Sequence, residues 1–313
     1  MTATNDDTDL NKQLTLCHEA EQRGVDSVLI DFGFGKPDPF AWAAALGRRT
    51  THLKLLVAVR AGVSSPTYCV QQVNTVAAVT GGRVCVAIAD EGTPDDQRYY
   101  GDVLGPDARH RRSDEFWSVC HGLWRDDEPV DFSGSHYHIE GAKITTPFVS
   151  QGRSRPEIYV AGDSEQAAEI AVRHADCLFV PAASPEGMAS RMRPVLESGT
   201  EVGLEVSLIA AAKRDDAIRN GQALLGQEQN WLTPHLCAVA PDQGSKAVAL
   251  VGSAADVVEA IFEFQAAGVT QFLFTGYPDL EQMVFFGEEI LPRVREREHA
   301  RAGGGSVSPP GPK

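Results

Sequence analysis

Apolar and polar residues follow one another along the chain in two patterns. Seven short runs are almost entirely apolar, which is typical of parallel strands that are covered on both faces. They occupy residues 26–31, 53–60, 82–90, 156–162, 177–182, 205–212 and 270–276. Other segments repeat apolar residues every three to four positions, the spacing of amphipathic helices. They occupy residues 10–24, 40–50, 66–82, 109–124, 164–175, 184–198, 214–226, 253–268 and 280–294.

Repeated strand–helix units of this kind predict an α/β fold, and we expect a TIM (β/α)8 barrel with its site at the carboxyl-terminal ends of the strands. The alternative is an open, doubly wound sheet, but no G-x-G-x-x-G fingerprint follows a strand. Residues 129–147 predict an inserted hairpin with a glycine-containing turn.

The first strand of such a barrel has no clear counterpart, because only a polar segment precedes the first helix. Either this segment forms an abbreviated strand, or the strand is missing and the barrel is open there, to be closed by a partner chain. We expect a disordered N-terminus over residues 1–10 and a single barrel domain over residues 11–298. Residues 299–313 are rich in Gly, Ser and Pro and predict a disordered tail.

Composition narrows the classes of partner. A formal net charge of −15 opposes binding to nucleic acid and to anionic membranes. No apolar run approaches the roughly 20 residues that span a bilayer, and the polar N-terminus has no secretory pattern, so we expect a cytoplasmic protein. The six cysteines lack C-x-x-C spacing, which favours reduced, mostly buried thiols.

Three segments carry more specific motifs: VDFSGSHYHIEGAK at residues 130–143, PEIYVAGDSEQAAEIAVRHADCLFV at residues 156–180 and FLFTGYPDLE at residues 272–281. Over roughly residues 15–295 the chain resembles the bacterial luciferase-like flavin monooxygenases, and alkanesulfonate monooxygenase is the nearest subgroup. The resemblance implies a barrel that takes reduced FMN from a separate flavin reductase and uses it with dioxygen to oxygenate an organic substrate.

The resemblance places the FMN phosphate at the turn after the strand of residues 156–162. Gly162 would allow close approach, and Ser164 offers a hydroxyl at a helix N-terminus, where the helix dipole favours an anion. Ala161 and Asp163 complete this turn. The alternative is that Asp163 or Ser164 only caps the helix.

Four further positions are implied to lie near the cofactor. Arg109 and His110 stand where the family has an Arg-Tyr pair, and His110 could donate a hydrogen bond to the phosphate. The alternative is a solvated, basic start of a helix. Ala87 and Asp90 stand where the family has an Asn and a small residue beside the flavin ring, so a carboxylate at Asp90 is a departure.

Five residues are implied on the substrate side. Tyr277 and Arg60 match family positions at strand ends, although Tyr277 could be structural and Arg60 could pair with Asp31 or Asp90. Glu205 and Ser207 align with the sulfonate-binding Arg and the active-site His of the subgroup.

Asp38 aligns with a cysteine near the site of the subgroup. A sulfonate would meet carboxylates instead of guanidinium groups, so we exclude alkanesulfonates as the substrate. His136 and His138 share a strand face, but no third ligand is evident and we expect no metal.

Two functions follow from these residues. The first is a two-component, reduced-FMN-dependent monooxygenase of specialised metabolism, in which Glu205 and Asp38 suit an amine or act as general base. The alternative is a degenerate barrel without flavin that serves as a partner subunit or a cofactor-independent enzyme. For either, we expect a homodimer or higher oligomer, or a heteromer with a homologue.

Overall fold

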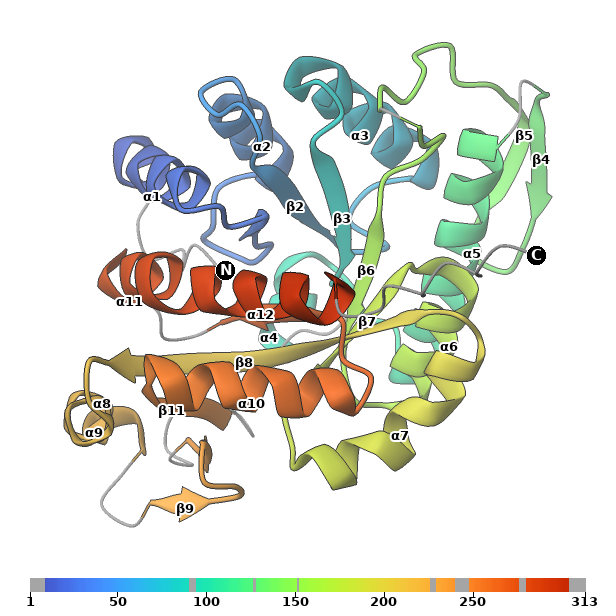
Figure 1. Ribbon diagram of the computed structural model, residues 1–313. Coiled ribbons are helices and arrows are strands. Elements are labelled where there is room, and N and C mark those ends of the chain that lie inside the picture. Colours follow the sequence, from blue (N-terminus) through green and yellow to red (C-terminus); the bar gives the residue numbers. More distant parts are fainter. Residues whose placement is uncertain are drawn as a thin grey trace, which may run out of the picture.

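The computed structural model describes residues 9–89, 94–125, 128–150, 152–225, 229–239, 248–275 and 280–303. Its centre is a parallel sheet surrounded by helices (Figure 1), as predicted for a (β/α)8 barrel. The neighbouring strands of this sheet are, in order, β1 (Ser27–Ile30), β2 (Lys54–Val59), β3 (Val84–Ile88), β6 (Ile158–Ala161), β7 (Cys177–Pro181), β8 (Glu201–Ala211) and β12 (Gln271–Phe274). Each strand corresponds to one of the apolar runs in the sequence, and the α/β barrel prediction is confirmed.

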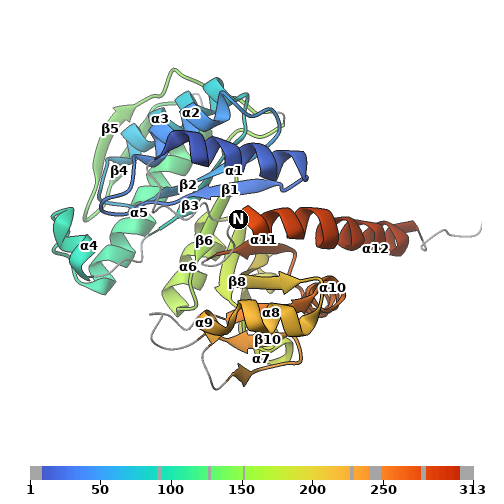
Figure 2. The ribbon, with the colours of Figure 1, turned by 90° about the vertical axis from the view of Figure 1, so that its left-hand side faces the viewer.

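The helices alternate with the strands and cover the outside of the sheet (Figures 1 and 2). They are α1 (Leu10–Gln22), α2 (Pro39–Gly47), α3 (Pro66–Thr80), α4 (Pro94–Tyr99), α5 (Pro106–Arg125), α6 (Glu165–His174), α7 (Pro185–Glu197), α8 (Arg214–Asn220), α9 (Gln222–Leu225), α10 (Ala254–Ala266), α11 (Leu280–Phe285) and α12 (Leu291–Gly303). A π-helical turn, η2 (Phe286–Ile290), joins α11 to α12. Several begin at a serine whose hydroxyl accepts a hydrogen bond from the first turn, among them α3, α6, α7 and α10.

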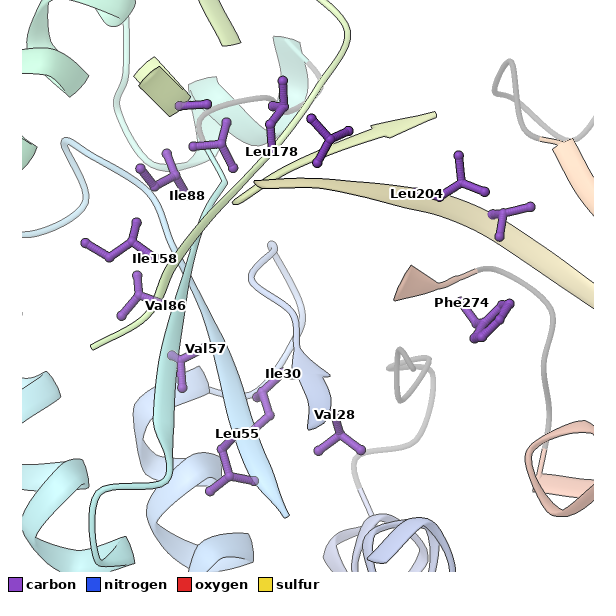
Figure 3. Close-up of a cluster of buried hydrophobic side chains, with 14 of the residues drawn as sticks. Val28, Ile30, Leu55, Val57, Val86, Ile88, Ile158, Leu178, Leu204 and Phe274 are labelled. Carbon is purple, nitrogen blue, oxygen red and sulfur yellow. The ribbon is translucent and has the colours of Figure 1, made fainter. Parts of the chain in front are cut away.

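The main core lies between the strands and the helices. Val57, Val86, Ile158 and Leu204, from four different strands, belong to this buried cluster (Figure 3). Because side chains alternate along a strand, their neighbours in sequence face the inside of the barrel. These inward-facing positions include Ala58, Ala87, Tyr159 and Glu205.

The barrel is open between β1 and β12. Among the described residues, β1 pairs with β2 alone and β12 pairs with β8 alone. A cavity of about 700 Å³ is lined by residues of both strands, including Ser27 and Leu273. The first described element is α1, and the segment in which a preceding strand would lie, residues 1–8, is outside the described residues.

Two additions extend the barrel. The predicted hairpin is present as β4 (Val130–Ser133) and β5 (His138–Ala142), which pair antiparallel and lie beside α5 (Figure 1). The sequence did not predict three further strands, β9 (Asn230–Trp231), β10 (Leu236–Ala238) and β11 (Val248–Ser253). β11 pairs in parallel with the carboxyl-terminal half of β8, and β10 and β9 follow it in the sheet. The strands β9 and β10 are too short to show an alternating pattern.

The C-terminal helix is longer than predicted. α12 continues to Gly303, past the expected domain end at residue 298, because residues 291–303 are mostly good helix formers. Arg297 and Glu298 of α12 bind Glu259 and Gln265 of α10. Residues 1–8 and 304–313 lie outside the described residues.

Two expectations from composition can be compared with the structure. All six cysteines are free and buried, so the prediction of reduced thiols in apolar surroundings is confirmed. Within the described ranges, no helix combines the length and apolar character needed to cross a membrane.

Candidate active site

Arg60 connects three strand ends at the carboxyl-terminal side of the barrel. It directly follows β2 and is 7% exposed. Its Nε donates a hydrogen bond of 3.0 Å to the carbonyl oxygen of Ala89, after β3. Its guanidinium carbon lies 4.9 Å from the ring centroid of Phe32, after β1. The predicted alternative partner Asp90 lies outside the described residues.

Glu205 and Ser207 project from β8 on its inward-facing side and both contact Thr275, which follows β12. The Thr275 hydroxyl donates a hydrogen bond of 3.2 Å to Oε1 of Glu205. The Ser207 hydroxyl donates one of 2.9 Å to the carbonyl oxygen of Thr275. The structure therefore brings two predicted site residues together through a third that the sequence had not indicated.

The carboxyl group of Glu205 has no cation beside it among the described residues. Burial raises the pKa of Glu205 above its ordinary value of 4.5, and the nearby Asp31 carboxylate raises it further. The hydrogen bond from Thr275 only partly offsets these effects. Asp31 itself forms an ion pair with Lys36 of the same loop. The strand ends thus hold a carboxyl group whose ionised form is less favourable than it would be in water.

Asp38 has a different environment. Its Oδ1 accepts a hydrogen bond of 2.8 Å from the backbone N–H of Ala41, which makes Asp38 the N-cap of α2. The side chain is exposed on the loop between β1 and α2. This contact is a sufficient structural reason for an aspartate here.

The turn after β6 has the geometry of an anion-binding corner. Gly162 is buried with φ of +151°, a conformation that residues with a Cβ rarely adopt. Ser164 caps α6, its Oγ accepting a hydrogen bond of 3.1 Å from the N–H of Ala167. Its hydroxyl proton is still available to a ligand, because an accepting hydroxyl can also donate.

Ser164, rather than Asp163, is therefore the cap of α6. The side chain of Asp163 and the Cβ of Ala161 are exposed at the same turn. Gly162, Asp163 and Ser164 line a cavity of about 910 Å³ between α6 and α7, which also includes Met188 and Met192. The corner has the room and the donors for a phosphate, with a carboxylate at its edge.

The beginning of α5 lies beside α6, as the resemblance implied. His110 places Nε2 3.1 Å from Oε2 of Glu169, in the second turn of α6. Arg109 donates a hydrogen bond to the carbonyl oxygen of Leu104. Glu169 thus competes with any phosphate for His110.

The inward-facing side chains around Ala87 are small. Ala87 is paired in register with Ala58 on β2 and with Tyr159 on β6. The ring of Tyr159 stacks on Phe179 of β7, with 5.5 Å between centroids. Ala58 and Ala87 lie at the level of this aromatic pair, and their small side chains leave space beside it. Tyr277 and Asp90, the remaining predicted residues, lie outside the described residues.

A model of the luciferase-like monooxygenase family matches residues 1–271. The chain belongs to the luciferase-like monooxygenase family. The family predicted from the sequence motifs is therefore confirmed, and so is the class of enzyme for which the family is named.

Solved structures share this fold at low sequence identity. A long-chain alkane monooxygenase is 18% identical with a TM-score of 0.78, over 93% of this chain and 85% of that chain. A riboflavin lyase, whose structure contains modified FMN and riboflavin, is 18% identical with a TM-score of 0.76, over 93% of this chain and 85% of that chain. A secondary alcohol dehydrogenase that depends on coenzyme F₄₂₀ is 20% identical with a TM-score of 0.71, over 91% of this chain and 95% of that chain.

Sequence reasoning missed an aromatic rim, which we define as Phe32, Phe34, Tyr99 and Tyr100. The ring centroids of Phe32 and Tyr100 lie 5.0 Å apart, and those of Phe34 and Tyr99 lie 4.4 Å apart. Phe34 is 61% exposed and Tyr99 is 58% exposed. The signal in the sequence was two pairs of nearby aromatic residues, one in the loop after β1 and one at the end of α4.

Sequence reasoning also missed a buried ion pair at the start of α5. Arg112 lies 2.7 Å from Asp102, and both side chains are nearly buried. Hydrogen bonds and the charge of Arg112 hold the pKa of Asp102 below its ordinary value despite burial. A Cβ at Gly62 would collide with the Arg112 guanidinium, so this glycine is needed for close approach. The ion pair joins α5 to the segment between α4 and α5, and Arg112 packs closely on Gly62 of the loop after β2.

The opposite end of the barrel contains a second set of charged residues, which we call the floor network: Lys54, Arg153, Arg155, Glu157 and Asp176. Lys54 lies 2.8 Å from Glu157, and Arg155 lies 2.7 Å from Asp176. Arg153 lies 2.9 Å from Asp176. The pKa values of both carboxyl groups are lowered, because these contacts outweigh the effect of burial.

The two hairpin histidines have partners within the protein. His136 places Nδ1 3.2 Å from Oε1 of Glu115, and His138 places Nε2 3.0 Å from Oε1 of Glu140. Glu115 also accepts hydrogen bonds from the backbone N–H groups of residues 135–137. In the part of the chain that the structure describes, no group of three His, Cys, Asp or Glu side chains could hold a metal ion.

Proposed function

We propose that this protein is the oxygenating component of a two-component monooxygenase, which receives reduced FMN from a separate reductase and oxygenates a small organic molecule that is not an alkanesulfonate. The observation that carries the proposal is the corner at Gly162 and Ser164, a serine-capped helix N-terminus beside a backbone turn that only glycine adopts easily. Family membership and the FMN in the riboflavin lyase structure support the choice of cofactor.

The residues of the corner fit a phosphate. Ser164 would donate its hydroxyl proton, and the first N–H groups of α6 would face the anion together with the positive end of the helix dipole. The small side chains of Ala58, Ala87 and Ala161 would leave the flat ring system unobstructed. Reduced flavin, when bound, supplies the electrons that activate dioxygen.

The contribution of the protein is to position substrate and cofactor. The stacked rings of Tyr159 and Phe179 present an apolar surface to the barrel interior, which would limit contact between a bound cofactor and water. Glu205 presents a carboxyl group where the resemblance places the sulfonate-binding arginine, so anionic substrates are repelled. A neutral or cationic molecule is compatible with a carboxyl group at this position.

A specific observation favours a second candidate, a flavin-free role as a partner subunit or as a cofactor-independent enzyme. Asp163, Glu165 and Glu169 all lie at the corner or on the first two turns of α6, and Glu169 already binds His110. Three carboxylates would oppose a phosphate dianion.

Titration with reduced FMN under anaerobic conditions, and with oxidised FMN, separates the two candidates. We expect saturable binding of reduced FMN that becomes about 10-fold weaker in Ser164→Ala, because a hydrogen bond to a charged group is lost. Ser253→Ala is the matched control: it removes the N-cap of α10, outside the corner, and should leave FMN binding unchanged. An absence of measurable affinity in the wild type would overturn the proposal in favour of the flavin-free role.

A further inference from the structure

Among the described residues, Glu205 has a hydroxyl as its hydrogen-bond partner and no cation beside it. Its hydrogen bond with Thr275 occupies Oε1 and orients the carboxyl group. Its Oε2 accepts no hydrogen bond from the described residues. A buried carboxylate in this condition is costly, unless a ligand supplies the missing donor or positive charge.

We propose that the substrate is an organic cation, an amine in its ammonium form, whose nitrogen lies against the carboxylate of Glu205. The inference rests on the function proposed above and names the substrate class of the same site. An ammonium group donates hydrogen bonds to a carboxylate and cancels its charge at once, whereas an alcohol or a thioether cannot cancel the charge.

The cations near Glu205 already have other partners, so a ligand would have to supply the positive charge that Glu205 needs. Asp31 faces Glu205 and raises its electrostatic cost, but Asp31 is itself neutralised by Lys36. Arg60 is bound to the carbonyl oxygen of Ala89 and lies over the ring of Phe32. Both cations of these two loops are therefore already engaged with other groups.

The aromatic rim provides a second, independent feature that suits a cation. The faces of aromatic rings attract positive charge, with about 0.5–2 kcal/mol per contact depending on desolvation. Phe32 already makes such a contact with Arg60, at 4.9 Å. Phe34, after β1, and Tyr99, at the end of α4, lie 4.4 Å apart between centroids and remain largely exposed. The rim therefore offers aromatic faces to an ammonium ion, and Phe32 directly follows Asp31, the carboxylate that influences Glu205.

The test uses three probes that share a phenyl ring and differ in charge: benzylammonium, its near-isostere benzyl alcohol, and benzenesulfonate. Calorimetric titration of the full-length protein at pH 7.5, with and without FMN, measures their affinities. We expect benzylammonium to bind at least 10-fold more tightly than benzyl alcohol, and benzenesulfonate not to bind. Equal affinity for benzylammonium and benzyl alcohol would overturn the inference.

Two variants of β8 test whether the preference for benzylammonium depends on Glu205. Glu205→Gln keeps the size of the side chain and should lower the affinity for benzylammonium about 10-fold to 100-fold, so that the preference over benzyl alcohol disappears. Glu201→Gln is the control, because Glu201 lies on the same side of β8 at the opposite end, where its Oε2 binds Thr270 and Gln271. A cation preference that survives in Glu205→Gln contradicts the inference.

The outcomes separate this inference from the proposed function. Binding of reduced FMN without a preference for benzylammonium would support the monooxygenase proposal and contradict the proposed substrate class. A Glu205-dependent preference for benzylammonium in a protein that does not bind FMN would support the cation site and contradict the proposed monooxygenase function. The ratio of the two probe affinities within one variant is unaffected by a change in its folded fraction.

Discussion

The two ends of the barrel treat buried carboxyl groups in opposite ways. In the floor network, Glu157 and Asp176 contact Lys54, Arg153 and Arg155, and their pKa values are lowered. At the carboxyl-terminal ends of the strands, Glu205 faces the same interior with a hydroxyl as its partner, and its pKa is raised. The fold therefore places cations directly against the carboxylates of the floor network, whereas among the described residues it places only a hydroxyl against Glu205.

The difference also has a cost in stability. Charge pairs with good hydrogen bonds stabilise the end of the barrel that has no role in catalysis in this fold. An unpaired carboxyl group at the other end destabilises the folded state, as is common in binding sites. Three variants test this contrast, from the largest expected effect to the smallest.

Asp176→Asn should have the largest effect. Asp176 accepts hydrogen bonds from the N–H of Ile158 and from both Arg153 and Arg155. Removal of its charge leaves Arg155 without its carboxylate, while Arg153 keeps Glu157 at 3.5 Å, so we expect a loss of about 2 kcal/mol in the free energy of unfolding, measured by urea denaturation.

The pH dependence of the free energy of unfolding shows whether Asp176 of the floor network stabilises the folded protein. The folded-state pKa of Asp176 lies below the ordinary value of 3.8, so its stabilisation is complete above that value and is lost as the pH falls through the lowered pKa. The variant should therefore lose less stability than the wild type on acidification below about pH 4. Asp216→Asn, which removes an exposed pair with Arg219, is the control and should change stability by less than about 0.5 kcal/mol. An Asp176→Asn variant as stable as this control contradicts the prediction.

Glu205→Gln should have a smaller effect of opposite sign. The folded-state pKa of Glu205 lies above 4.5, so the folded protein holds a proton that the unfolded chain releases, and stability falls as the pH rises through this window. The variant lacks this penalty, and we expect it to be about 1 kcal/mol more stable than the wild type at pH 7 and nearly equal at pH 4. Urea denaturation across this range measures the difference, and a destabilised variant at pH 7 would show that Glu205 has a structural role instead.

Thr275→Val should have the smallest effect on stability. The change removes the hydroxyl that donates to Glu205, while the backbone carbonyl that binds Ser207 stays in place. Because the donor favours the ionised form, its loss should raise the pKa of Glu205 further. Titration of the Glu205 carboxyl carbon by NMR in both proteins measures this, and an unchanged or lower pKa contradicts the assigned hydrogen bond.

The sequence indicated which residues form the turn before α6, but not which of them caps the helix or what contacts its neighbours make. The motif at residues 161–164 predicted a helix start near a phosphate and left open which residue caps it. The structure assigns the cap to Ser164 and places Glu169 against His110. The contact between His110 and Glu169 joins two helices 59 positions apart in sequence, so no local pattern could reveal it.

By itself, the sequence determined the architecture. Apolar strands in alternation with amphipathic helices leave few ways to bury their surfaces, and the parallel barrel is one of them. The absence of an apolar run before α1 also predicted an abbreviated or missing first strand, and this stays a prediction. These features depend on local periodicity, which is a property of neighbouring residues.

Only the tertiary structure decided the chemistry of each carboxyl group. Glu157 and Glu205 are both glutamates on or beside barrel strands, and nothing in their immediate sequence separates them. Their pKa values differ because Lys54, 103 positions away, reaches Glu157, while Asp31 and Thr275 surround Glu205. Electrostatic energy depends on distance in space and on burial, and the fold sets both.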